Sequence, residues 1–78
     1  MSPSEWRAAQ QFSQEKIAIL FGVRGANPAR TWQRWERGER SPPLSVVSKL
    51  EALSDGKVSA RSWVDVRQAY LAKQGVSA

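Results

Sequence analysis

Residues 14–40, QEKIAILFGVRGANPARTWQRWERGER, decide how the chain folds. The first part of this stretch has the apolar spacing of a short helix, and a glycine follows that can end one. Asn27 followed by Pro28 is a typical helix start, because asparagine caps the first turn and proline suits its first position. The stretch therefore predicts two helices, at about 14–21 and about 28–37, joined by a glycine-containing turn.

The second of these helices has two unlike faces. On a wheel of about 100° per residue, Trp32 and Trp35 fall on one side. The opposite side holds Arg30, Arg34 and Arg37, with Gln33 at its edge. Most charged faces are only solvated, but arginine and glutamine can pair bidentately with guanine and adenine in the major groove. We expect the tryptophans to pack in the core and the arginine side to face DNA.

Composition excludes several classes of protein. The 78 residues allow one domain, over residues 1–78, and 41% hydrophobic residues favour a folded chain. The chain has no cysteine and no histidine, which removes the thiol nucleophile, the commonest general base and the usual zinc ligands. We therefore expect no enzyme, no metal site and no cofactor. Without a transmembrane run or a signal-peptide pattern, we expect a cytoplasmic protein with no membrane contact.

The charge of the chain favours an acidic partner. The net charge is +5, and most of the 12 basic residues are arginine. Several arginines gather between Arg24 and Arg40, where only two glutamates offset them. A basic cluster of this kind is typical of nucleic-acid binding, because arginine suits phosphate and guanine edges.

Three further helices complete an all-α fold. They are expected at about 3–11, capped by Ser2, at about 43–54, and at about 60–73, capped by Ser59. Besides Trp32 and Trp35, the expected core residues are Trp6, Ala9, Phe12, Ile17, Ala18, Leu20, Phe21, Leu44, Val46, Val47, Leu50, Leu53, Trp63, Val66 and Tyr70. Ile19 either packs beneath the turn, which we favour, or belongs to a protein contact.

Residues 13–54 resemble the Cro/C1-type (XRE-like) helix-turn-helix family of phage and bacterial repressors. The matching stretches are SQEKIAILFGV, RTWQRWERGERSPP and LSVVSKLEALS, with a small residue at Ala18, a turn glycine at Gly22 and the signature Trp35 to Gly38. The resemblance implies a compact five-helix lambda-repressor-like domain, usually dimeric, that puts its third helix in the major groove.

The resemblance also implies roles for individual residues. The implied base-reading residues are Ala29, Arg30, Gln33 and Arg34. The implied DNA-backbone contacts are Gln14, Lys16, Arg24, Thr31, Arg37, Arg40 and Ser41. The turn within Val23–Asn27 is about four residues longer than in the family, so the angle between the two helices can differ. Arg24 in this turn either reaches a phosphate or is solvated.

Two pairs of residues carry structural expectations. Glu36 falls near the apolar side of its helix, where an unpaired carboxylate would be costly. Similar repressors often place an arginine seven residues before the first glutamine of the second helix, as Arg7 precedes Gln14 here, so we expect an ion pair between Arg7 and Glu36. Val64 and Leu71 form a second apolar pair on the last helix, which is either a dimer contact or ordinary surface.

Together these features predict a sequence-specific double-stranded DNA-binding transcriptional regulator. The simplest form is a repressor that binds a palindromic operator as a homodimer, with no small-molecule ligand. One alternative is a protein-interaction module on the same fold, such as an anti-activator or adaptor. Another is a non-specific nucleoid-type binder.

Overall fold

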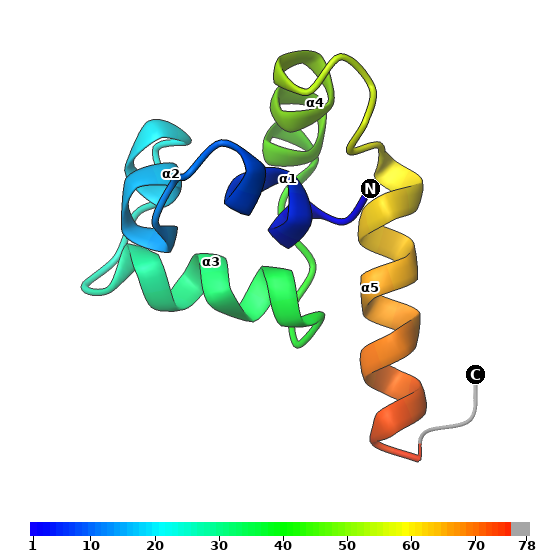
Figure 1. Cartoon of the computed structure of the whole chain (residues 1–78). Coiled ribbons are helices and arrows are strands. Elements are labelled where there is room, and N and C mark those ends of the chain that lie inside the picture. Colours follow the sequence, from blue (N-terminus) through cyan, green and yellow to red (C-terminus); the bar gives the residue numbers. More distant parts are fainter. Residues whose placement is uncertain (76–78) are drawn as a thin grey trace.

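The computed structural model describes residues 1–75, so residues 76–78 of the expected domain lie outside the described part. Within residues 1–75 the chain forms five helices and no strand, as expected. The helices are α1 (Pro3–Ala9), α2 (Gln14–Leu20), α3 (Pro28–Arg37), α4 (Leu44–Leu53) and α5 (Ala60–Lys73). Figure 1 shows α1, α2 and α4 gathered above α3, while α5 runs alongside them and extends below α3. None of the described helices has the length and apolar character needed to cross a membrane.

The helix starts follow from local capping. The Ser2 hydroxyl accepts from the backbone N–H of Glu5, whose carboxylate accepts in return from the N–H of Ser2 at 3.0 Å. Ser13 caps α2 through Lys16 N at 3.0 Å, and Asn27 caps α3 through Arg30 N at 3.1 Å. The expected bounds of α3 and α5 are confirmed.

Three expected helix boundaries, two ends and one start, are wrong by one or two residues. The first helix ends at Ala9 instead of about Gln11, because Gln11 has a left-handed φ of 60°. The second ends at Leu20 instead of Phe21, and the fourth starts at Leu44 because Pro43 has an extended backbone and acts as its cap.

The turn between α2 and α3 is fixed at both ends. Gly22 has a φ of 68°, and the N–H of Val23 donates to the carbonyl of Ala18 at 3.0 Å, which closes α2. Val23 also packs against the core. The next residues, 24–26, are exposed, and Asn27 then begins α3 with its own cap.

Trp32 lies at the centre of the core. It is fully buried, and its ring makes edge contacts with Phe21, Trp35 and Trp63, with centroids 5.1, 5.5 and 6.1 Å away. Trp35 is buried beside it. The apolar face of α3 therefore points inward, as the helical wheel predicts, and its arginines are left outside.

Several expected core residues lie outside the core. Val66 and Tyr70 on α5 are half-buried and are not part of the core cluster. Four others are exposed, namely Ala9, Leu20, Leu44 and Leu53. Each of the four exposed residues lies in the first or last turn of a short helix, where fewer neighbours cover it, and Val46 and Leu50 take the inner positions of α4. The expectation that Ile19 packs beneath the turn is also wrong, because Ile19 is 62% exposed.

The end of α3 lies directly against α5. Gly38 is buried with a φ of 84°, and a Cβ added there would come 2.5 Å from the carbonyl oxygen of Val66. Nη1 of Arg67 donates to the carbonyls of Gly38 and Glu39, both at 2.7 Å. A glycine and an arginine cap therefore hold the last turn of α3 against the middle of α5.

Candidate nucleic-acid interface

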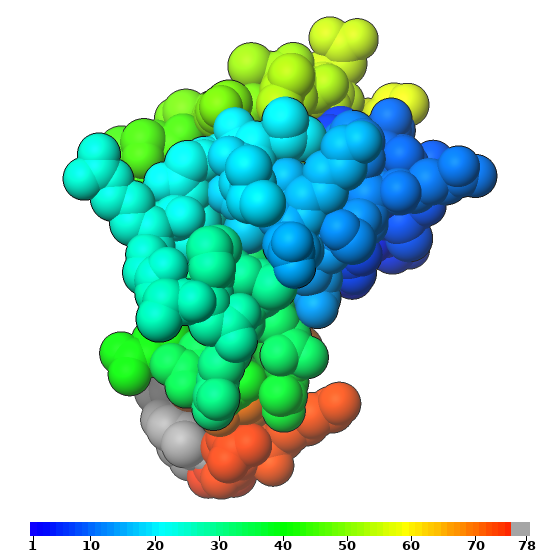
Figure 2. Space-filling model, turned by 90° about the vertical axis from the view of Figure 1, so that its left-hand side faces the viewer, coloured from blue at the N-terminus to red at the C-terminus, as the bar shows by residue number. Residues whose placement is uncertain are grey.

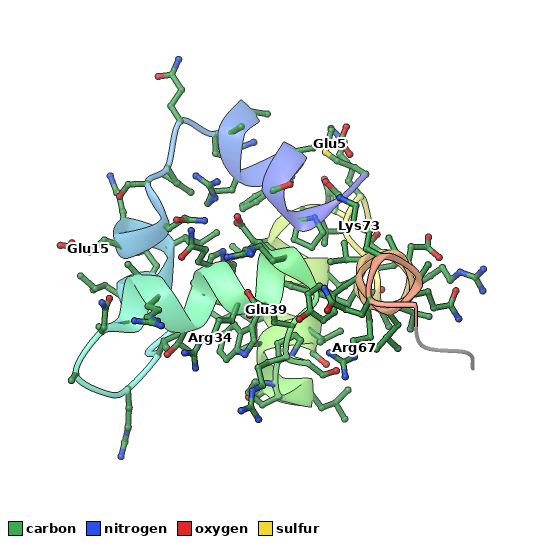
Figure 3. All side chains as sticks on the ribbon, turned by 90° about the horizontal axis from the view of Figure 1, so that it is seen from below. Glu5, Glu15, Arg34, Glu39, Arg67 and Lys73 are labelled. Atoms are coloured by element: carbon green, nitrogen blue, oxygen red, sulfur yellow. The ribbon has the colours of Figure 1, made fainter. Side chains whose placement is uncertain are left out.

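The four expected base-reading residues line one groove on the surface. This groove has a volume of about 330 Å³, and Gln14, Arg37 and Glu39 complete its lining beside Ala29, Arg30, Gln33 and Arg34. Arg30, Gln33 and Arg37 are exposed, whereas Ala29 and Arg34 are half-buried. Figure 3 looks at the molecule from below and shows α3 on the near side, with Arg34 and Glu39 along it. The arrangement gives a polar surface that is rich in guanidinium groups.

Gln14 reaches this groove from the start of α2. Its amide Nε2 donates to Oε1 of Glu36 at 3.1 Å, and its side chain is half-buried. An amide nitrogen carries two hydrogens, so one remains for an outside acceptor. Gln14 is therefore held at the edge of the groove, where the expected phosphate contact would form.

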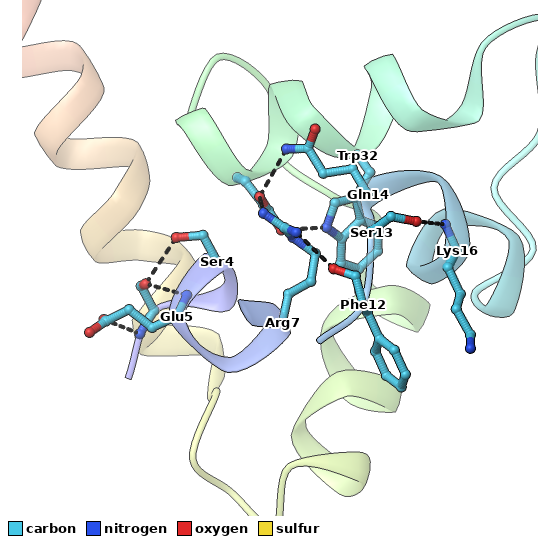
Figure 4. Close-up of polar contacts among 10 residues, drawn as sticks. Ser4, Glu5, Arg7, Phe12, Ser13, Gln14, Lys16 and Trp32 are labelled. Carbon is cyan, nitrogen blue, oxygen red and sulfur yellow. Dashed lines mark hydrogen bonds and ion pairs between the residues drawn. The ribbon is translucent and has the colours of Figure 1, made fainter. Parts of the chain in front are cut away.

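Glu36 is the acceptor on which three helices converge. The expected ion pair with Arg7 is present, with Nε 2.6 Å from Oε2 and Nη2 3.2 Å from Oε1. The indole Nε1 of Trp32 donates to Oε2 at 2.7 Å. Figure 4 shows Arg7, Gln14 and Trp32 pointing toward this common centre. The Glu36 side chain is only 4% exposed, so its carboxylate has lost most of its hydrogen bonds with water. The three donors replace them.

Glu39 is the one groove residue that sequence reasoning missed. Its Oε2 lies 3.3 Å from Nε of Arg37, and its side chain is more buried than that of its partner. A carboxylate in this position opposes the approach of phosphate and occupies one of the arginines. Its place two residues after Arg37 is the only sequence signal that could have indicated the pair.

Three of the expected DNA-backbone contacts do not line the groove, namely Lys16, Arg24 and Thr31. Lys16 is exposed, with Nζ 5.4 Å from the centre of the Phe12 ring. Arg24 is exposed in the turn, and the hydroxyl of Thr31 donates to the carbonyl of Asn27 at 3.5 Å. The contact of these three residues with the DNA backbone remains a prediction.

Arg40 and Ser41 line a second, larger hollow. It has a volume of about 440 Å³ where the α3–α4 connection, α4 and α5 meet, and its apolar lining includes Leu44 and Val64. Val64 is 44% exposed, whereas Leu71 is half-buried and lies outside this hollow. The two expected dimer residues therefore do not line the same hollow.

Residues 1–75 hold no cluster of three side chains of the types that bind metal ions. Comparisons of the chain with family models, with characterised proteins and with solved structures found no match.

Proposed function

We propose that this protein is a sequence-specific double-stranded DNA-binding transcriptional regulator, most simply a repressor, with a lambda-repressor-like helix-turn-helix fold. In this proposal α3 enters the major groove and α2 lies across it. The observation that carries the proposal is the groove that joins Arg30, Gln33 and Arg34 on α3 with Gln14 at the start of α2.

The residue types of the groove support base recognition. Arginine pairs bidentately with the O6 and N7 atoms of guanine, and glutamine pairs with the N6 and N7 atoms of adenine. The opposite face of α3 is anchored by two buried tryptophans, so the outward side chains stand on a rigid element. A net charge of +5 adds the non-specific attraction that DNA binding requires.

Selection of bound duplexes from a random pool, read by sequencing, tests the proposal. We expect an enriched motif in which two half-sites are related by a two-fold axis, with centres about one DNA turn apart. Enrichment of no motif, together with equal affinity for unrelated duplexes, would instead favour the nucleoid-type binder. A single half-site bound as tightly as the full palindrome would contradict the homodimer.

A protein-interaction module is the second candidate, and exposed apolar side chains favour it. Ile19 and Leu20 on α2 are 62% and 50% exposed, and Leu44 on α4 is 76% exposed. Such residues are also common on ordinary surfaces. Substitution of Ile19 and Leu20 by serine separates the two candidates. A DNA-binding regulator should keep its DNA affinity, because neither residue lines the groove, whereas an interaction module should lose its protein partner.

A further inference from the structure

The C-terminal half of α5 places one basic side chain, Lys73, on the wall of a hollow next to the groove. A hollow of about 380 Å³ separates it from the end of α3, and Glu36, Arg37, Tyr70, Lys73 and Gln74 contribute to its walls. Arg37 lines both this hollow and the groove of α3. The groove and the hollow therefore meet at the Arg37 side chain.

The position of α5 brings this hollow toward any duplex that lies along α3. Figure 1 shows the end of α5 extending beyond α3, and Figure 2 shows the same end emerging below α3 when the molecule is viewed from the side of α2. A helix with its side chains is about as wide as the major groove, about 12 Å, so an element beside it lies over a bounding strand. The end of α5 would therefore meet phosphates, not bases.

The negative groups around the hollow are already engaged. The Glu36 carboxylate accepts from Arg7, Gln14 and Trp32. The Glu39 carboxylate pairs with Nε of Arg37 at 3.3 Å, and the two terminal nitrogens of the Arg37 guanidinium remain for an outside anion. Within residues 1–75 Lys73 forms no ion pair, and its side chain is exposed. Its ammonium group is available to an outside anion.

We propose that this hollow binds a DNA backbone phosphate between Lys73 and Arg37, so that α5 contributes a contact beyond those of α2 and α3. The inference rests on the proposed function and names a further part of the same interface. A phosphate there would fix how far α3 is rotated in the major groove, because it ties α5 as well as the end of α3 to the DNA backbone.

Lys73→Gln and Lys57→Gln form a matched pair for the test. Both lysines are exposed and lose the same charge, but Lys57 lies in the α4–α5 connection and lines neither the groove nor the hollow. We expect Lys73→Gln to weaken binding to selected and random duplexes alike and to reduce the slope of log affinity against log salt by about one unit. Lys57→Gln should match the unsubstituted protein.

Duplexes with a neutral methylphosphonate at one backbone position then locate the phosphate. At one position, the methylphosphonate should weaken binding of the unsubstituted protein but have little further effect on binding of Lys73→Gln. If Lys73→Gln behaves like Lys57→Gln while Arg34→Ala loses specific binding, this inference fails and the proposed function stands. Tighter binding by Lys73→Gln would also overturn it. Failure of the unsubstituted protein to bind any duplex would overturn both.

Discussion

Gln14 and Glu36, 22 positions apart in the chain, share a hydrogen bond of 3.1 Å that links the surface groove to the buried ion pair. The carboxylate that accepts from Gln14 also accepts from Arg7 and from Trp32. One acidic side chain therefore orients a groove residue and holds α1, α2 and α3 together.

Arg7→Ala should destabilise the fold strongly, because it leaves the Glu36 carboxylate buried without its charged partner. Loss of one partner of a buried pair costs about 3–5 kcal/mol in the free energy of unfolding, which urea titration can measure. Arg61→Ala is the control, since its pair with Asp65 is exposed and should be worth less than about 1 kcal/mol. Equal unfolding free energies for the two variants would contradict the importance of the Glu36 cluster.

Arg30→Ala and Arg34→Ala should each reduce specific DNA binding by about 1–3 kcal/mol and relax the preference at one base pair. Arg40→Ala should weaken binding to all sequences equally and lower the salt slope by about one unit, because a phosphate contact carries no base preference. Binding to the selected and to random duplexes separates these effects, with circular dichroism as the check on folding. An unchanged specific-to-random ratio in both Arg30→Ala and Arg34→Ala would remove α3 as the recognition element.

Glu39→Gln should strengthen DNA binding. The substitution removes a negative charge from the groove and releases Arg37 from its 3.3 Å ion pair. We expect a higher affinity for every duplex and a steeper salt dependence, by up to about one unit of slope. Glu51→Gln on α4 makes the same charge change at an exposed site outside the groove and should bind less tightly than Glu39→Gln.

Gly38→Ala should cost more stability than Gly22→Ala, although both glycines have a positive φ. A Cβ at Gly22 meets nothing within 4 Å, so only the left-handed backbone opposes alanine, at about 1–2 kcal/mol. At Gly38 the added atom also meets the backbone of Val66, which adds about 1–3 kcal/mol of overpacking. Thermal unfolding of both variants measures the difference, and equal melting temperatures would show that α5 moves aside freely.

Protonation of Glu5 should loosen the start of α1. The backbone N–H and the hydroxyl of Ser2 lower the pKa of the Glu5 carboxyl below its ordinary value of 4.5. A carboxyl whose pKa is lowered in the folded state stabilises the fold at pH values above its ordinary pKa. This stabilisation disappears as the pH falls through the lowered pKa. Glu5→Gln should therefore be less stable than the unsubstituted protein at neutral pH, and the difference should shrink in acid. A pH-independent difference would contradict this account.

Much of the fold could be predicted because its signals are local. Ser13 and Asn27 cap their helices through residues three positions away, so the sequence alone indicates where α2 and α3 begin. Burial in short helices was less predictable, because periodicity does not tell which of two adjacent apolar residues faces inward. Val58 was missed for a related reason. It lies in a connection without a periodic pattern, yet it is fully buried.

In the candidate site, too, the features with a local signal could be predicted, and those that depend on packing between helices could not. The outward positions of Arg30 and Gln33 follow from the helical wheel and the buried tryptophans. The hydrogen bond between Gln14 and Glu36 joins different helices, and no spacing rule predicts it. The contact of Gly38 with α5 and the place of Lys73 beside Arg37 likewise depend on how distant segments pack.

The turn between α2 and α3 leaves room for change in evolution and in design. Val23 anchors its beginning on the core and Asn27 starts the next helix independently, so the exposed residues 24–26 hold neither helix in place. The entropy of closing such a turn grows only slowly with its length. Insertions there should accumulate at little cost, and an affinity tag or a dye-labelling sequence could be placed at this point without moving the arginines of α3.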